Sequence, residues 1–371
     1  METGTMKYEE RLVFALRALY RRFGYRQFKM RKFEEYDLYA RNKDFLISDN
    51  IITFTDLNGK LMALKPDVTL SIVRSGTDAD GGVQKVYYNE TVYRVSAAAR
   101  GFREMAQSGV ECIGAVDDFC LAETLMLAVE SLRTISPDCV LDVSHLDIVS
   151  ALVDALGVGD DVRRDVLKCI GEKNPHELEA LCRAAGADAG AIADLKQLVQ
   201  TSGAPAQVLP ALKAMDRAPA AAVEQLETLT AALDALGLGD YLRIDFSVVG
   251  DMRYYNGVVF KGFVSGVPAG VLSGGQYDKL MRKMRRSARA VGFAVYLDQL
   301  ERFSSEAEDY DVDTVLLYAP GTSAAALLRA VRALSADGRS VTAQHTVPEK
   351  LRFRRLVRLD GDEVKIIEQN A

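Results

Sequence analysis

Polar side chains alternate along one short stretch of the chain, at a spacing that could hold a ligand. Gln107, Gly109 and Glu111 are separated by single residues. Side chains two residues apart share one face of a β-strand, so Gln107 and Glu111 should project to the same side. Because glycine has no side chain, we expect a gap over Gly109 through which a ligand can approach. We therefore predict a binding site on this strand face.

Two runs rich in valine and tyrosine should position this site. Val86–Val92 and Gln107–Ile113 are predicted to be antiparallel strands, joined by a loop at Val95–Arg103. Three arginines lie at or within the loop: Arg94, Arg100 and Arg103. This predicted hairpin is the element around which we expect the site to be organised.

A second polar cluster follows another predicted hairpin. Asn50–Leu70 should form it, because Asn58-Gly59 between apolar runs is a strong turn signal. Asp67 and Thr69 near its end offer oxygen acceptors to a ligand. Asp67 also has a plainer interpretation, as the N-cap of a helix over Val68–Ser75.

Two segments that contain tyrosine complete the candidates. Tyr254-Tyr255 precedes the apolar run Val258–Phe260, and Gly274-Gly275 precedes Tyr277. Paired glycines let the backbone approach a ligand closely. The first segment could instead be a core strand, and the glycines could mark a β-bulge. Gln107 and Glu111 could equally lie on a solvated strand face.

These segments, in this order, resemble the histidyl-tRNA synthetase family of class II aminoacyl-tRNA synthetases. Gln107–Glu111 matches the family's Q-x-G-x-E, and Lys65–Thr69 is similar to its R-P-E-x-T. Tyr254–Phe260 resembles the family's histidine-specific Y-Y-x-x-T-V-F, and Ser273–Leu280 resembles G-G-G-R-Y-D-x-L. All four matches in the family's order make chance agreement improbable.

The resemblance implies a pocket for free histidine. Asp67, Thr69 and Gln107 would accept hydrogen bonds from the ammonium group. Glu111 and the Tyr255 phenol would meet the two imidazole nitrogens, and Arg94 or Arg100 would bind the carboxylate. The predicted effector-binding residues are Asp67, Thr69, Arg94, Gln107, Glu111, Tyr254, Tyr255 and Tyr277. No cofactor and no metal are expected.

Three positions depart from the family where its catalytic groups stand. Gln299 falls on the arginine of motif 3, Gly250 on the catalytic arginine before Y-Y, and Ser96 on the glutamate that orients adenine. Adenylation spreads negative charge over phosphate oxygens, and loss of one fixed cation typically costs about 100-fold or more in rate. We therefore expect no catalytic residues and almost no adenylation.

A kept pocket beside lost cations resembles one branch of the family, the regulatory subunits of ATP phosphoribosyltransferase. The resemblance implies a non-catalytic chain that acts in the first step of histidine biosynthesis. Histidine would be the effector, and a short-form catalytic subunit the partner in a hetero-oligomer. A homodimer within that complex is also implied, although Arg31 replaces a proline of the family's dimer-forming motif 1.

Two other functions stay open: an active or degenerate histidyl-tRNA synthetase, and a synthetase-like RNA-binding sensor module. The net charge of −6 argues against RNA as the main partner, since phosphate neutralisation dominates such binding. The basic runs Arg282–Arg289 and Lys350–Arg358 are better interpreted as solvated faces or partner contacts than as RNA-binding patches. We expect no tRNA partner.

The composition is that of a globular protein of two or three domains. The chain has 371 residues, of which 49% are hydrophobic and 26% charged. Five scattered cysteines without C-x-x-C, and three separated histidines, argue against a disulfide framework or a zinc site. No signal peptide or membrane span is evident, so we expect a cytoplasmic protein.

The predicted fold class is α+β: a class II synthetase-like antiparallel sheet flanked by helices, with a helical insertion and a shortened C-terminal α/β domain. Residues 1–156 and 241–305 should form the core, 157–240 the Ala- and Leu-rich insertion, and 306–371 an anticodon-binding-like domain. Ala288–Phe303 is predicted to be a helix and resembles motif 3.

Overall fold

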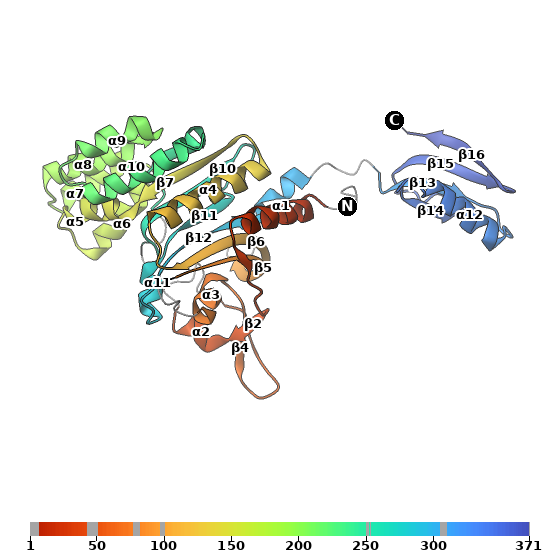
Figure 1. The fold of residues 1–371 in the computed structure, drawn as a ribbon, viewed down its shortest axis with the longest axis horizontal. Helices are drawn as coiled ribbons and strands as arrows, with labels where there is room; N and C mark the ends of the chain where they lie inside the picture. The colour runs from red at the N-terminus through yellow and green to blue at the C-terminus, as the bar shows by residue number, and fades with distance from the viewer. Residues whose placement is uncertain are drawn as a thin grey trace. The chain divides into compact units, whose positions relative to one another are not determined.

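The computed structural model describes residues 7–42, 51–76, 82–96, 101–249, 252, 254–304 and 310–370. The chain divides into two compact units, Met1–Glu301 and Arg302–Ala371, and each is described by itself. Figure 1 shows the elements of both.

The first unit is built on a nine-stranded sheet in the order β1-β5-β6-β12-β11-β10-β7-β9-β8 (Figure 1). The strands are β1 (Arg26–Gln27), β5 (Val83–Ser96), β6 (Gly101–Gly114), β7 (Cys139–His145), β8 (Ser202–Gly203), β9 (Leu242–Asp245), β10 (Asn256–Val264), β11 (Leu272–Gln276) and β12 (Arg289–Tyr296). Neighbours are antiparallel except for the pairs β1–β5 and β7–β9. The predicted antiparallel sheet is thus present at the centre, with parallel pairs toward its two edges.

The hairpin predicted to organise the site is longer than expected. Strands β5 and β6 pair continuously from Val83 opposite Gly114 to Ser96 opposite Gly101. The prediction of a loop over Val95–Arg103 was therefore wrong at both ends, and only residues 97–100 separate the strands. No glycine or proline interrupts the chain before Gly101, so nothing stops the ladder at Val95.

Helices α1 (Tyr8–Arg22) and α4 (Asp118–Ile135) pack together against the sheet. Tyr20 of α1 is fully buried and its hydroxyl lies 3.1 Å from Ser131 Oγ of α4. Asp117 accepts a hydrogen bond from the Cys120 backbone N–H at 3.0 Å, which satisfies a free donor at the start of α4.

The predicted helix over Ala288–Phe303 was wrong. Residues Arg289–Tyr296 form β12, which pairs with β6 on one side and β11 on the other. A 3₁₀ helix, η4 (Leu297–Ser304), follows it. A strand in the middle of a sheet is buried on both faces, so its short apolar run cannot be distinguished from a buried helix by periodicity.

A small three-stranded sheet lies beside the main one in the order β2-β4-β3, with β2 (Phe33–Glu35), β3 (Thr53–Thr55) and β4 (Leu61–Leu64). The predicted hairpin with Asn58-Gly59 at its turn is confirmed, since Thr55 faces Leu61. Two short helices adjoin it, α2 (Tyr36–Ala40) and α3 (Thr69–Ser75).

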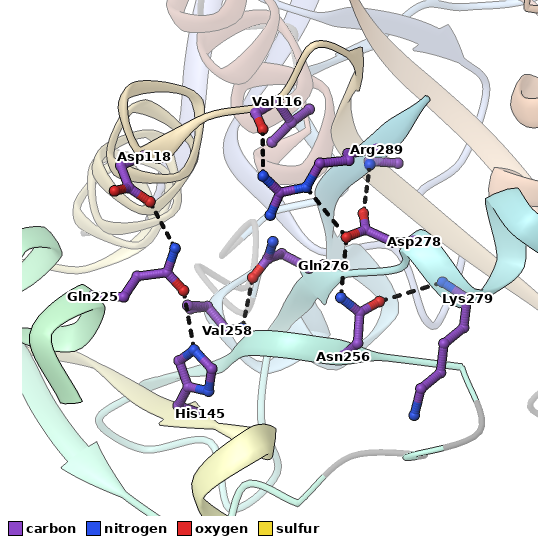
Figure 2. Close-up of polar contacts among 11 residues, drawn as sticks. Val116, Asp118, His145, Gln225, Asn256, Val258, Gln276, Asp278, Lys279 and Arg289 are labelled. Atoms are coloured by element: carbon purple, nitrogen blue, oxygen red, sulfur yellow. Dashed lines mark hydrogen bonds and ion pairs between the residues drawn. The ribbon is translucent and has the colours of Figure 1, made fainter. Parts of the chain in front are cut away.

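Helices fill the chain between β7 and β9: α5 (Leu146–Asp154), α6 (Asp160–Gly171), α7 (Pro175–Ala184), α8 (Ala189–Gln200), α9 (Pro205–Lys213) and α10 (Ala220–Asp234), then the 3₁₀ turn η3 (Gly239–Tyr241). Gln225 of α10 connects this group to the sheet layer (Figure 2). Its amide donates to Asp118 Oδ1 at 2.6 Å, and its carbonyl oxygen lies 3.0 Å from His145 Nε2. Because the Asp147 N–H donates to His145 Nδ1, the imidazole proton belongs on Nε2, facing Gln225.

The second unit is a four-stranded sheet in the order β14-β13-β15-β16 with one helix, α12 (Ala324–Leu334). Its strands are β13 (Val312–Leu317), β14 (Val341–Gln344), β15 (Phe353–Asp360) and β16 (Glu363–Gln369). Strands and a helix together fit the α/β class predicted for this part of the chain. Leu316 and Val357 pack with Ala330 of α12 to form one side of its core.

Within the described ranges, no helix is long and apolar enough to cross a membrane. The same residues contain no group of three or more histidine, cysteine, aspartate or glutamate side chains that could hold a metal ion. All five cysteines are free thiols.

Candidate functional site

One cavity of about 740 Å³ lies on the face of the nine-stranded sheet that carries Gln107 and Glu111. Its wall includes every residue that the sequence predicted for the effector site: Asp67, Thr69, Arg94, Gln107, Glu111, Tyr254, Tyr255 and Tyr277. The register between β6 and β12 explains why the cavity lies over these strands. Glu111 faces Gly292 and Gly109 faces Ala294, so small residues leave the sheet surface open.

Glu111 is the polar centre of this cavity. Thr69 Oγ1 donates to its Oε1 at 2.8 Å, and the Tyr277 hydroxyl donates to its Oε2 at 2.6 Å. A Cβ atom on Gly292 would lie 1.8 Å from Oε2, so only glycine leaves room for the carboxylate there. Burial raises the pKa of Glu111 to about 8, against the lowering effect of its two hydrogen-bond donors.

Asp67 lies at the rim of the same wall and has two roles. Its Oδ1 accepts the Leu70 backbone N–H at 2.9 Å, so it does cap the first turn of α3 as the plainer interpretation held. It also lines the cavity. Burial raises the pKa of this carboxyl, and the nearby Arg94 guanidinium opposes that shift. Arg94 is itself held by a 2.9 Å hydrogen bond from Nε to the Pro66 carbonyl oxygen.

Gln107 lines the cavity and carries a buried amide donor. Its side chain is only 4% exposed, and its Nε2 has no hydrogen-bond partner among the described residues. A buried amide without a partner costs free energy that a ligand acceptor could recover. The solvated strand face considered for Gln107 and Glu111 is therefore wrong, because both side chains are buried.

The predicted gap over Gly109 is not open. A Cβ atom on Gly109 would lie 2.6 Å from both Cζ and Oη of Tyr88, the residue opposite it on β5. The tyrosine ring thus lies over the glycine and lines the cavity. The sequence analysis missed Tyr88 because its role depends on the register between two strands, which the residue pattern of one strand does not contain.

Three tyrosines, Tyr254, Tyr255 and Tyr277, line the cavity next to one another. The rings of Tyr254 and Tyr255 meet edge to face at 4.5 Å between centroids, and Tyr254 lies 5.8 Å from Tyr277. Burial raises the pKa of the Tyr255 phenol, as do the neighbouring Tyr296, Glu111 and Asp67. The Tyr255 phenol therefore stays neutral and can act as a hydrogen-bond donor.

Of the three positions where the resemblance predicted lost catalytic groups, the structure describes the side chain of one, Gln299. Gln299 lines the cavity, and its amide donates to Asp298 Oδ2 at 3.2 Å. Gly250 and Arg100 lie outside the described residues, and of Ser96 only its place as the last residue of β5 is described. Among the described residues of the cavity wall, the cations are Arg94 and Lys261.

The predicted residues thus contribute two carboxyl groups, an amide, phenols and one guanidinium to the cavity wall. Such a set suits a small zwitterion whose side chain carries its own donors and acceptors. Much of the cavity extends past these residues, along Ser273, Ala294 and Tyr296.

Comparison with known proteins identifies relatives of this chain. The family model described as histidyl-tRNA synthetase matches residues 3–300. The ATP phosphoribosyltransferase regulatory subunit of Alkaliphilus metalliredigens is 28% identical over 286 residues, which span 75% of this chain and 72% of that protein. The subunit of the same name from Oceanobacillus iheyensis is 24% identical over 356 residues, or 93% and 86%.

Solved structures share the fold. An ATP phosphoribosyltransferase regulatory subunit/histidyl-tRNA synthetase from Bacillus halodurans aligns with a TM-score of 0.77 at 22% identity, covering 94% of this chain and 93% of that one. A chain of the ATP phosphoribosyl transferase (HisG:HisZ) complex of Thermotoga maritima aligns with a TM-score of 0.63 at 21% identity, covering 78% and 97%. With the family model matched over most of its length, the chain belongs to the histidyl-tRNA synthetase family.

Proposed function

We propose that this chain is the regulatory, non-catalytic subunit of an ATP phosphoribosyltransferase, the enzyme of the first step of histidine biosynthesis. It binds L-histidine in the cavity around Glu111 and conveys feedback inhibition to a short-form catalytic subunit in the cytoplasm. The observation that carries the proposal is the single cavity that unites all eight predicted side chains while glutamine occupies position 299.

The chemistry of the wall supports histidine as the ligand. Glu111 and the Tyr255 phenol offer an acceptor and a donor, and imidazole has one nitrogen of each kind. Asp67 and Thr69 supply acceptors for the ammonium group. We assign the carboxylate to Arg94, the one guanidinium that the described residues place in the cavity wall.

The absence of a cation at position 299 supports the non-catalytic part of the proposal. Stabilising the charge that develops at phosphorus needs fixed positive groups. An amide cannot supply this charge, and Gln299 is turned toward Asp298. Relatives that carry the name of a regulatory subunit, and a fold neighbour from a HisG:HisZ complex, support assembly with a catalytic partner.

A thermal-shift series with the twenty amino acids tests the ligand. We expect histidine to raise the melting temperature in a concentration-dependent way, since a ligand that binds only the folded state stabilises it. No shift at millimolar histidine would remove the effector role. Co-expression with a short-form catalytic subunit tests the partner: a stable hetero-oligomer on gel filtration is expected, and separate elution would count against it.

An active histidyl-tRNA synthetase is the competing function, since the matching family model carries that description. ATP–pyrophosphate exchange in the presence of histidine distinguishes the two. The regulatory proposal predicts exchange at the background level, and appreciable exchange would overturn it.

A further inference from the structure

Asp278 is a buried acid directly behind the cavity wall that the binding chemistry does not use. It follows Tyr277, begins helix α11 (Asp278–Lys283) and is 8% exposed. Its Oδ1 accepts the Ala290 backbone N–H at 2.9 Å, and its Oδ2 accepts Asn256 Nδ2 at 3.1 Å and Arg289 Nε at 3.4 Å (Figure 2). Three strand or helix ends therefore meet at one carboxylate.

Each of these partners adjoins a residue of the cavity. Asn256 follows Tyr255 in the chain, and Ala290 lies two residues before Gly292, against which Glu111 packs. The Tyr277 N–H also donates to the Ala290 carbonyl oxygen at 3.0 Å. Asp278 thus connects the backbone segments that carry Tyr255, Tyr277 and Gly292.

The sheet is irregular at the Tyr255 end of β10. Pairing between β10 and β11 is irregular between Asn256 and Val259, and Gly257 in between has a φ of +59°. Two side chains bind backbone N–H groups in this irregular region. Gln276 Oε1 accepts the Val258 N–H at 2.8 Å, and Asn256 Oδ1 accepts the Lys279 N–H at 3.3 Å (Figure 2). A bulge of this kind re-aims the residues next to it.

We propose that Asp278 is a positioning residue for the amino-acid site: it holds Tyr255 and Tyr277 in register with Glu111 through Asn256 and the start of β12. The inference rests on the proposed function, because Asp278 would affect the affinity for histidine. It also explains part of the basic run Arg282–Arg289, since Arg289 bridges Asp278 to the Val116 carbonyl oxygen at 2.8 Å.

The charge of Asp278 matters as well as its shape. A carboxylate accepts from all three donors at once, and bonds to an ionised group are stronger than neutral ones. Asparagine at this position would direct an NH₂ group at either the Ala290 N–H or the Asn256 and Arg289 donors. One side of the connection would therefore break in Asp278→Asn although the volume is unchanged.

A double-mutant cycle with Asp278→Asn and Tyr255→Phe tests the inference, with histidine affinity measured by calorimetry on the full chain. We expect Asp278→Asn to weaken histidine binding by about tenfold in the native background. In the Tyr255→Phe background the same change should cost less, about threefold, because one of the two hydroxyls that Asp278 positions is gone. A purely structural role predicts an equal factor in both backgrounds, and that result would overturn the inference.

Two further variants keep the test decisive. Asp188→Asn is the control: Asp188 is the N-cap of α8 and accepts the Ala191 N–H at 2.9 Å, but it does not line the cavity, so affinity should not change. If Asp278→Asn does not fold, Asn256→Ala is carried through the same cycle with the same expectation. Native protein that fails to bind histidine refutes the proposed function, whereas native binding with an unchanged Asp278→Asn refutes only the positioning role.

Discussion

At the scale of single residues, the proposed function depends on a carboxyl group that is costly to bury. Glu111 is 2% exposed and its pKa is raised to about 8 from 4.5 by burial. The protein keeps it there with two donors, Thr69 and Tyr277, and with a glycine at position 292 that makes room for it. Polar groups buried at such a cost are typical of ligand sites.

Replacing Glu111 by glutamine tests both its role and its cost. Above pH 8, where Glu111 is ionised, we expect Glu111→Gln to weaken histidine binding by about ten- to a hundredfold, the worth of a hydrogen bond to a charged group. Calorimetric titration of the two proteins measures the factor. Equal affinity in both would show that Glu111 does not contact the ligand.

The same substitution should change how stability depends on pH. Between pH 4.5 and about 8 the folded chain holds a proton on Glu111 that the unfolded chain has released. The free energy of unfolding that this group contributes therefore falls as pH rises through that window. Urea unfolding at pH 6 and pH 8.5 should show a larger loss for the native chain than for Glu111→Gln. An identical loss in both would contradict the raised pKa.

Gly292 provides a second test at this scale. In Gly292→Ala the new methyl group meets Glu111 Oε2, so we expect a loss of about 1–3 kcal/mol in the free energy of unfolding and a loss of histidine binding. Gly159→Ala is the control, because nothing lies within 4 Å of a Cβ atom there. The account fails at this point if the two alanine variants behave alike.

The eight predicted side chains line one cavity, but their arrangement could not be predicted from the sequence. Spacing within one strand places Gln107 and Glu111 on one face, as the structure has them. Tyr88 and Gly292 join the site only through pairing with neighbouring strands, and register between strands is set by tertiary packing. The gap predicted over Gly109 was wrong for the same reason.

At the scale of elements, most helices and strands followed from periodicity and turn signals, and the failures have a physical pattern. The segment over Ala288–Phe303 was mistaken for a helix because β12 is paired on both sides and carries an almost continuous apolar run. The ends of β5 and β6 were missed because a long hairpin needs no turn residue until the chain reverses.

One buried ion pair joins the small sheet to the large one. Lys65 after β4 is 2% exposed and forms an ion pair with Glu90 of β5. Glu90 Oε1 also accepts the Met30 backbone N–H at 3.0 Å. The pair therefore fixes the segment that carries Asp67 and Thr69 against the strand that carries Tyr88.

Removing one partner of this pair should be strongly destabilising. We expect Lys65→Met to lower the free energy of unfolding by about 3–5 kcal/mol, since Glu90 would remain buried without its counter-charge. Denaturant unfolding measures this. Lys60→Met, at the exposed ion pair with Glu35, is the matched control and should stay within about 0.5 kcal/mol of the native chain. Similar losses in both would show that Lys65 does not carry the connection.

At the scale of the whole molecule, an adenylating fold is proposed to serve as a receptor. The cavity contains the groups proposed to hold an amino acid, while the described wall has glutamine at position 299. Inhibition of a partner then requires that histidine bind one quaternary state of the complex more tightly than another, because a ligand shifts an equilibrium only through differential affinity.

The most direct measurement is calorimetric titration of L-histidine into the full chain, without ATP, tRNA or a partner. The account predicts saturable binding at one site per chain, which Glu111→Gln weakens at least tenfold above pH 8. Absence of saturable binding at millimolar histidine would contradict the central claim.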